Sequence, residues 1–433
     1  MSDKTKLSTE SYKGVRDFYP EDNFIQNYIF NVWRKTAESY GYVEYNASIL
    51  EPAELYKQKS GEEIVGEQTY TFKDRGDRDV TLRPEMTPTV ARMVAGKIHD
   101  LVFPLRWYSI PNLFRYEKPQ KGRLREHWQL NVDLFGAEEI EADTEVISVA
   151  YKIMKKFGAK DKDFVIKIND RNIINALYLK FDLDEEKSQK ISKIIDKKNK
   201  IPESSFLEAI SEILGEKTGE FVRLLEKNDD LLSSFENKDE ISKNLFSLID
   251  GLEKLGIKNV VFEPTLMRGF DYYTGIVFEI YDTSEENNRS LFGGGRYDNL
   301  LELFGTKNVS GVGFGVGDVT MKDFLITHNL LPKYRPSTEI YICTLNKDYF
   351  VKAKEIAESL RDSGLNVGLD ISSKKVGEQI KIANKQSIPY VLCIGEDEIK
   401  SGLYPLKNME SGEEKKVKIE EIVGVVKRDT NYE

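Results

Sequence analysis

The sequence predicts an α+β protein in which an antiparallel sheet flanked by helices is interrupted by a helical insertion and followed by an α/β domain. Three observations support this prediction: strand-like segments before about residue 135 and again after residue 257, helical apolar spacing between them, and alternating strand-like and helix-like segments at the end. The length of 433 residues also suggests several domains. The expected parts are residues 1–170 and 257–334 for the two halves of the sheet domain, 171–256 for the insertion and 337–433 for the last domain.

Composition excludes several classes of protein. Hydrophobic residues make up 40% and charged residues 31%, which is typical of globular proteins and excludes fibrous ones. The net charge of −10 means that nucleic-acid binding would need a local basic patch. The chain has neither a run of about 18 apolar residues nor an apolar N-terminal segment, so we expect a cytoplasmic protein without membrane contact. Cys343 and Cys393 have no zinc-ligand spacing, and we expect buried thiols.

The first half of the sheet domain is expected to begin with a packing helix. Apolar residues between Phe24 and Ala37 share one helical stripe, and Gly41 ends the pattern. Strand-like segments follow as TYTFKD, DVTLRPE, LRWYSIPNLFRYE and RLREHWQLNVDLFG. A helix from about Glu138 to Phe157 closes this half.

Helical spacing continues through the insertion, where apolar residues such as Leu177, Ile191 and Phe206 recur among many Lys and Glu residues. Strand-like sequence returns with NVVFEPTL and GIVFEIYD, followed by the glycine-rich FGGGRYD and VSGVGFGVGD. These segments are expected to complete the sheet. After the linker RPSTE, the strand-like EIYICTL, NVGLDI and YVLCIGED alternate with helical segments, which predicts a compact α/β domain.

The strand predicted around residues 126–135 has one polar face. A two-residue period places His127, Gln129, Asn131 and Asp133 together, opposite an apolar face. A solvated sheet face shows the same pattern, so its neighbours decide between a site and a surface. Phosphate-binding glycine loops, the nucleophile elbow and the zinc-protease motif are all absent from the sequence, and three histidines leave little for a conventional triad.

Arginines and carboxylates lie next to this strand in the sequence. Arg115 and Glu117 share a strand face before the polar loop KPQKGRLR, and arginine at a strand end can bind phosphate through a forked pair of hydrogen bonds. An ordinary charged hairpin is the alternative. In TLRPEMTP, Glu85 and Thr87 lie at the start of a helix, where a buried carboxylate suits a substrate ammonium group. Capping of the helix by Thr87 is the structural alternative, and both could hold.

A third segment, PTLMRGFDYYTG, places Arg268 beside a glycine and close to Tyr272 and Tyr273. A cation held in such a position can stabilise the charge of a phosphoryl transition state without proton transfer.

Taken together and in this order, the segments resemble class II aminoacyl-tRNA synthetases, and RGFDYYTG is similar to the corresponding run of histidyl-tRNA synthetases. The resemblance extends over KGVRDFYPED, TLRPE, FRYEKPQKGR, GGGRYD and IPYVLCIGEDEIKSG, nearly the whole chain. It implies a class II sheet, a C-terminal anticodon-binding domain and a ligase reaction in protein biosynthesis. In that reaction L-histidine and Mg-ATP form histidyl-adenylate and pyrophosphate, and the histidyl group then moves to the 3′ end of tRNA(His).

The resemblance also implies roles for individual residues and a homodimer. Arg268 and Arg115 would be catalytic, and Mg²⁺ would arrive with ATP without dedicated protein ligands. The histidine-binding residues would be Glu85, Met86, Thr87, Gln129, Asp133, Tyr272 and Tyr273. Arg115, Glu117 and Arg123 would bind ATP, and Gln120 with Arg125 would meet the tRNA acceptor end.

The chain departs from the family pattern at three positions. Thr320, in Gly-Asp-Val-Thr, occupies the position of an ATP-binding arginine in the third class II motif, and Asp133 stands where the family more often has Glu. Ser48 replaces the proline of the first motif, which normally builds the dimer interface. Thr320 favours an alternative, a regulatory or histidine- or tRNA-sensing paralogue, whereas the anticodon-like domain argues against it. A generic α+β nucleotide-binding protein is a third interpretation.

Overall fold

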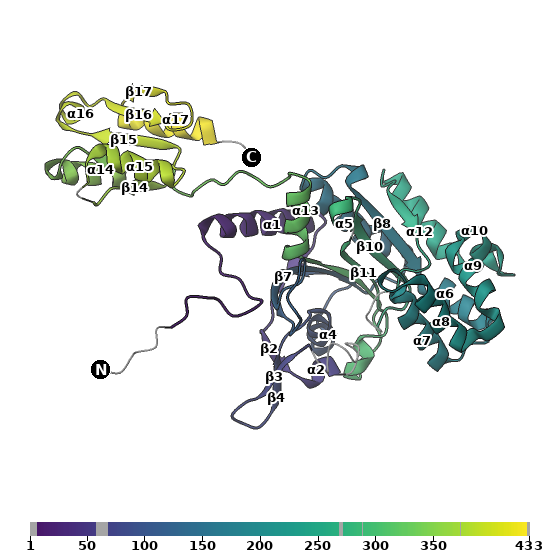
Figure 1. Ribbon diagram of the computed structural model, residues 1–433. Helices are drawn as coiled ribbons and strands as arrows, with labels where there is room; N and C mark the ends of the chain where they lie inside the picture. Colours follow the sequence, from purple (N-terminus) through teal and green to yellow (C-terminus); the bar gives the residue numbers. More distant parts are fainter. Residues whose placement is uncertain (1–6, 58–67, 268–271, 288, 373, 431–433) are drawn as a thin grey trace. The chain divides into compact units, whose positions relative to one another are not determined.

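The computed structural model describes residues 7–57, 68–267, 272–287, 289–372 and 374–430. The chain forms two compact units, which we call the sheet unit (residues 1–17 and 26–331) and the C-terminal unit (residues 18–25 and 332–433) (Figure 1). Among the described residues, no helix combines the length and apolar character that crossing a bilayer requires.

The sheet unit is built on a nine-stranded sheet whose strand order is β1-β5-β7-β12-β11-β10-β8-β9, with β6 paired to β7. Its strands are β1 (Val43–Glu44), β5 (Leu105–Ser109), β6 (Asn112–Phe114), β7 (Glu126–Phe135), β8 (Phe164–Asp170), β9 (Val260–Phe262), β10 (Ile276–Asp282), β11 (Ser290–Arg296) and β12 (Gly311–Gly317). The central pairs are antiparallel, as predicted, while β1–β5 and β8–β9 at the two ends are parallel. The sequence analysis predicted no strand at β8, so this strand is known only from the structure.

The hairpin predicted from TYTFKD and DVTLRPE forms, but it does not join the main sheet. It consists of β3 (Tyr70–Lys73) and β4 (Asp79–Leu82), which form a separate three-stranded sheet with β2 (Leu50–Pro52) in the order β2-β4-β3. Asp74 shapes the turn because its Oδ1 accepts hydrogen bonds from the backbone N–H groups of Gly76 and Arg78. The alternation of polar and apolar residues predicted the hairpin. Which sheet the hairpin joins depends on its pairing with β2, which is distant in sequence.

Helices cover both faces of the main sheet. Helices α5 (Ile140–Lys156) and α13 (Asp318–Thr327) pack on the central strands, and α4 (Thr87–Gly96) lies on the other side (Figure 1). Two further helices in the described part of the chain are α1 (Pro20–Ser39), whose Trp33 is fully buried, and the short α2 (Glu54–Lys57). The face next to α4 is therefore the one that can present residues of β7, β11 and β12 to a ligand.

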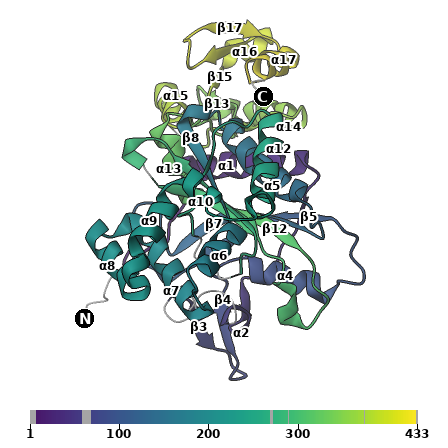
Figure 2. The same ribbon diagram turned by 90° about the vertical axis from the view of Figure 1, so that its right-hand side faces the viewer.

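The helical insertion lies between β8 and β9, and Figure 2 shows α7, α8 and α9 grouped to one side of the sheet. Its helices are α6 (Arg171–Lys180), α7 (Glu185–Asp196), α8 (Glu203–Leu214), α9 (Thr218–Glu226), α10 (Asn228–Ser233), α11 (Lys238–Ile241) and α12 (Lys243–Lys254). Asp170 and Asp184 cap α6 and α7 by accepting backbone hydrogen bonds. The predicted apolar residues form its core, since Leu177, Ile191 and Phe206 are all buried.

The C-terminal unit has a five-stranded sheet in the order β14-β13-β15-β16-β17. Its elements are β13 (Ile340–Thr344), α14 (Phe350–Asp362), β14 (Val367–Leu369), α15 (Val376–Lys385), β15 (Tyr390–Ile394), α16 (Glu396–Ser401), β16 (Tyr404–Asn408), β17 (Glu414–Val417) and α17 (Ile419–Thr430). The apolar clusters divide by face: Ile340 and Ile342 pack with α14 and α17, whereas Cys343 packs with α15. Cys343 is a buried free thiol, as predicted, and Cys393 opposite it is partly exposed.

Candidate active site

A polar pocket lies on the sheet face that carries the polar residues of β7. Strands β7, β11 and β12, the start of α4 and the segment before β10 contribute to it. Its lining residues are Glu85, Thr87, Arg115, Gln129, Asn131, Asp133, Tyr272, Tyr273, Gly293, Tyr297, Gly313, Phe314 and Gly315. The structure thus brings together residues that lie as much as 230 positions apart in the chain.

Glycines in β12 leave room for the polar side chains of β7. A Cβ atom on Gly313 would lie 2.5 Å from the carbonyl oxygen of Val132 and 2.7 Å from Oδ1 of Asp133. A Cβ atom on Gly315 would lie 2.8 Å from Cδ of Gln129. Because such distances are shorter than van der Waals contact, any larger residue would displace the pocket's polar groups.

Asp133 presents a hydrogen-bond acceptor to the pocket. The hydroxyl group of Tyr297 donates to its Oδ1, while its Oδ2 is buried and accepts no hydrogen bond from the described part of the chain. Burial raises the pKa of Asp133 to about 7, although the hydrogen bond from Tyr297 works in the opposite direction. Burial and the Asp133 charge also hold the pKa of Tyr297 well above 10, so the phenol stays a donor. An N–H group of a ligand would satisfy the remaining carboxylate oxygen.

A second carboxylate, Glu85, lies at the start of α4. Its side chain is buried, and its Oε2 accepts a hydrogen bond of 3.3 Å from the hydroxyl group of Tyr272. The ring centroids of Tyr272 and Tyr273 lie 4.9 Å apart, and both side chains line the pocket. Two buried carboxylates and two phenols thus make a site suited to a small ligand that carries several N–H groups.

The helix that follows Glu85 corrects one alternative and places two predicted residues. Thr87 is the first residue of α4, and the N-cap residue is Met86, which makes no side-chain capping bond. Capping by Thr87 was therefore the wrong alternative, and its side chain lines the pocket instead. Met86 is fully buried against Val90 in the hydrophobic cluster and is not one of the pocket-lining residues.

Arg115 borders the pocket and belongs to a small charged group. Its Nε donates a 2.9 Å hydrogen bond to the carbonyl oxygen of Pro84, which fixes the side chain beside Glu85. The Glu117 carboxylate lies 4.0 Å from Arg115 and 3.3 Å from Arg123, so it holds two guanidinium groups near each other. His127 lies nearby, and burial together with Arg115 and Arg16 lowers its pKa to about 3, which keeps the imidazole neutral.

The loop between Arg115 and β7 is ordered by its own contacts. Gln120 and Arg123 exchange backbone hydrogen bonds of 3.0 and 2.9 Å around Gly122, whose φ of 77° favours glycine. The guanidinium carbon of Arg125 lies 4.1 Å from the ring centroid of Tyr116, and its Nη1 donates to the hydroxyl group of Tyr12. Gln120 and Arg125 thus lie outside the pocket lining, and Arg125 ties the loop to the N-terminal segment.

Two groups of residues complete the comparison with the sequence predictions. Arg268 lies outside the described residues. The lining residues absent from the predicted site are Asn131, Gly293, Tyr297, Gly313, Phe314 and Gly315. GGGRYD and the alternating glycines of VSGVGFGVGD were the available signals, but only the strand register shows that they face Asp133 and Gln129. Across the described residues, no three carboxylate, imidazole or thiol groups converge on a metal position.

Comparison with known proteins agrees over both units. The family model described as "Histidyl-tRNA synthetase" matches residues 14–318, and the model described as "Anticodon binding domain" matches residues 339–429. The chain is 44% identical over 416 residues to a protein of Leptospira biflexa named "Histidine--tRNA ligase", with 94% of each chain covered. It is 36% identical over 430 residues to a protein of the same name from Pyrococcus furiosus, covering 96% of this chain and 98% of the other.

The fold gives a third line of support. The crystal structure of histidyl-tRNA synthetase from Nostoc sp. PCC 7120 superposes with a TM-score of 0.84 at 23% identity and covers 98% of this chain and all of the other. With a class II sheet, an anticodon-binding domain and these two relatives, the chain belongs to the histidyl-tRNA synthetase family.

Proposed function

We propose that this protein is a histidine–tRNA ligase that makes histidyl-adenylate from L-histidine and Mg-ATP and then charges tRNA(His). The observation that supports this best is the carboxylate of Asp133, whose buried Oδ2 has no hydrogen-bond partner among the described residues and which lines a pocket that also holds the Glu85 carboxylate. Histidine carries N–H donors on its α-ammonium group and on its imidazole ring. These two donor groups match the two carboxylates in the pocket. Membership of the family supplies the reaction class.

Each carboxylate then has a separate task in binding histidine. Glu85, with the hydroxyl group of Thr87, receives the α-ammonium group, and Asp133 accepts the N–H of the imidazole ring beside Gln129. An analogue without the ring N–H would leave the Asp133 carboxylate buried and unpaired. Loss of this hydrogen bond discriminates strongly against the analogue, because the free-energy cost of burying the Asp133 carboxylate is then not offset by a bond to the ligand.

Adenylation in this site needs positioning and positive charge more than proton transfer. A carboxylate oxygen of histidine attacks the α-phosphorus of ATP, and the bond to the pyrophosphate leaving group breaks. The attacking carboxylate is already ionised, so no general base is required, and the neutral His127 is consistent with this. Arg115 stabilises the α-phosphate from the side of β6. Arg268 shares that task in our proposal, on the basis of the family motif.

In the second step, the 3′-terminal hydroxyl group of the tRNA attacks the carbonyl carbon of histidyl-adenylate, and AMP leaves. We assign the acceptor end to the loop that carries Gln120 and Arg125, and the ATP phosphates to Arg115 and Arg123. Glu117 supports this assignment because it holds both arginines. Mg²⁺ belongs to this proposal as part of Mg-ATP.

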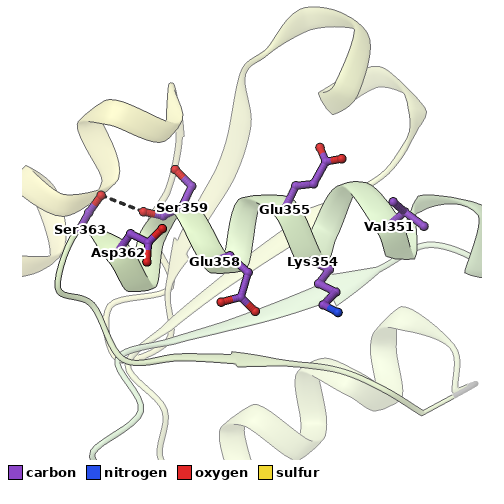
Figure 3. Close-up of a pocket in the computed structure, with 7 residues that line it drawn as sticks. All are labelled: Val351, Lys354, Glu355, Glu358, Ser359, Asp362 and Ser363. Carbon is purple, nitrogen blue, oxygen red and sulfur yellow. Dashed lines mark hydrogen bonds between the residues drawn. The ribbon is translucent and has the colours of Figure 1, made fainter.

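The charges of the C-terminal unit favour one side for the anticodon. Figure 3 shows the outer face of α14, where a shallow depression is lined by three carboxylates, of Glu355, Glu358 and Asp362, and by a single cation, Lys354. Glu355 and Glu358 pair with Lys352 and Arg361, each at 2.8 Å, so this face has no net positive charge to attract a phosphodiester backbone. Helix α15 covers the opposite face of the sheet, and exposed lysines occur on it and just before it, at positions 374, 375, 381 and 385. We assign tRNA contact to the α15 face.

A homodimer and a cytoplasmic location complete the proposal. Strand β1 lies at the edge of the nine-stranded sheet, and its Val43 is 63% exposed; Leu50 of β2 is 43% exposed. Exposed apolar side chains on an edge strand favour pairing with a second chain. A single complex of twice the chain mass in light scattering supports the dimer, and a Val43→Glu variant is expected to shift it towards monomer.

The decisive experiment is amino-acid-dependent ATP–pyrophosphate exchange with each of the twenty amino acids, followed by aminoacylation of tRNA(His). Exchange with histidine alone is the expected result. A folded protein that binds histidine but exchanges pyrophosphate with no amino acid would refute the proposal.

A further inference from the structure

Cationic side chains from separate parts of the chain gather at the start of α13. Arg16, Lys121, Arg289 and Lys322 all act on the carboxylate of Asp323, opposing the rise in its pKa that burial causes. Arg16 is itself paired with Asp318 at 2.7 Å. Four cations thus act on the carboxylate of Asp323, which concentrates positive charge at this corner of the sheet unit.

Arg289 is the arginine of this group that borders the same loop residue as Thr320, the position of the missing family arginine. Its Nη1 donates a 2.5 Å hydrogen bond to the carbonyl oxygen of Lys121, at the tip of the loop before β7. A Cβ atom on Gly122 would lie 3.5 Å from that Nη1 and 3.7 Å from Cγ2 of Thr320. The guanidinium group and the side chain of Thr320 thus border the same residue of the loop.

The Thr320 side chain also has a structural task of its own. Its hydroxyl group donates to the carbonyl oxygens of Leu291, at 2.9 Å, and Gly317, at 3.2 Å. The bond to Leu291 attaches the first turn of α13 to the beginning of β11, two residues after Arg289. A short polar residue at position 320 therefore brings the first residues of β11, and Arg289 with them, against α13.

Strand register places Arg289 relative to the pocket. Gly317 pairs with Gln129, a pocket residue, and a Cβ atom on Gly317 would lie 3.7 Å from Oγ1 of Thr320. Along β11, the pocket residue Gly293 follows Arg289 by four positions, which is about 13 Å of extended chain. Arg289 thus lies beyond the Gln129 end of the pocket, away from Asp133.

We propose that Arg289 binds the β- and γ-phosphates of ATP, supplying from the residue before β11 the guanidinium group that the family's third motif supplies from position 320. The inference rests on the proposed function, because it names the phosphate-binding residue of that same site. A guanidinium has five N–H donors in a planar fork, so the bond to Lys121 leaves donors for phosphate oxygens. Lys121 and Lys322 add positive charge around a ligand that carries several negative charges.

The test is ATP–pyrophosphate exchange with Arg289→Ala and Arg289→Gln. Loss of a charge-assisted contact to phosphate is expected to raise the KM for ATP by about tenfold to a hundredfold, with the KM for histidine within about twofold of wild type. Arg289→Gln keeps an N–H donor for the Lys121 carbonyl but removes the charge, so we expect it to behave like Arg289→Ala. Arg78→Ala is the matched control, since Arg78 pairs with Asp74 in the exposed β3–β4 turn.

A double variant tests whether an arginine at position 320 can replace Arg289. Adding Thr320→Arg to Arg289→Ala is expected to restore a low KM for ATP, whereas Thr320→Arg alone leaves two arginines beside Gly122 and gives no gain. An unchanged KM for ATP in Arg289→Ala would overturn the proposal. A normal KM in Arg289→Gln would also overturn it, because it would reduce Arg289 to a loop tether.

If the proposed ligase function is wrong, the wild-type protein itself gives a different result from the one expected above. In that case the wild-type protein shows no exchange with any amino acid, and titration with a fluorescent ATP analogue still compares wild type with Arg289→Gln. Equal affinities in that titration would overturn the role of Arg289.

Discussion

Asp133→Asn separates the energetic cost of the buried carboxylate from its use in the pocket. Asn has nearly the volume of Asp and can accept the hydrogen bond of Tyr297 through its Oδ1, but it carries no charge. The substitution is therefore expected to stabilise the protein at neutral and alkaline pH while it weakens histidine binding. Function and stability conflict at this residue, as is common where a site needs a poorly solvated group.

The size of the stabilisation follows from the pKa of the carboxyl group. Burial raises the pKa of Asp133 from 3.8 to about 7, and each unit of pKa corresponds to about 1.36 kcal/mol. The folded protein thus holds this proton more tightly than the unfolded chain, so ionisation costs stability as the pH rises from about 4 to 7. The cost is about 1.7 kcal/mol at pH 5 and about 4 kcal/mol at pH 8.

Urea unfolding at these two pH values measures the difference. All three tryptophans, Trp33, Trp107 and Trp128, lie in the sheet unit, so their fluorescence reports the unfolding of that unit alone. The stability advantage of Asp133→Asn over wild type should be larger at pH 8 than at pH 5 by about 2.5 kcal/mol. An equal advantage at both pH values would refute the raised pKa. A KM for histidine that stays at the wild-type value would refute the role of Asp133 in binding the ring.

Three further predictions concern the pocket, the chemical step and the tRNA. Gly315→Ala should raise the KM for histidine, because its Cβ displaces the Gln129 side chain; a normal KM would contradict the tight floor of the pocket. Arg268→Ala should slow single-turnover adenylation by orders of magnitude with histidine binding nearly intact, and an unchanged rate would remove its assigned role. Lys381→Glu on α15 should raise the KM for tRNA severalfold, whereas Lys354→Glu on α14 should not; equal effects would contradict the assignment of the α15 face.

Local patterning predicted the polar face of β7. The two-residue period of a strand is independent of tertiary contacts, so Gln129, Asn131 and Asp133 could be assigned to one face, and all three line the pocket. Glu85 and Thr87 were predicted in the same way from the helix start that follows TLRPE. The role of Thr87 could not be decided locally, because the exact first residue of the helix, and so its N-cap, is fixed only in the structure.

Other features depend on residues that are distant in sequence. The partner of Asp133, Tyr297, lies 164 positions away, and the hydrogen bond between them arises only when β7, β12 and β11 are placed side by side. The separate sheet of β2, β4 and β3 is a similar case, since a hairpin pattern does not state what it pairs with. The parallel pair β8–β9 brackets the whole insertion, so no local signal connects its strands.

The sequence by itself determined the family, the order of sheet, insertion and anticodon-binding domain, and most of the residues offered to the pocket. These follow from motifs and periodicities that are written along the chain. Only the tertiary structure decided the pKa of Asp133, the burial of Met86 in the apolar cluster, and the position of Arg289 and Thr320 beside the same loop residue. Burial and the interactions between charged groups depend on distances in space. Those distances are set only when the strands pair in their native register.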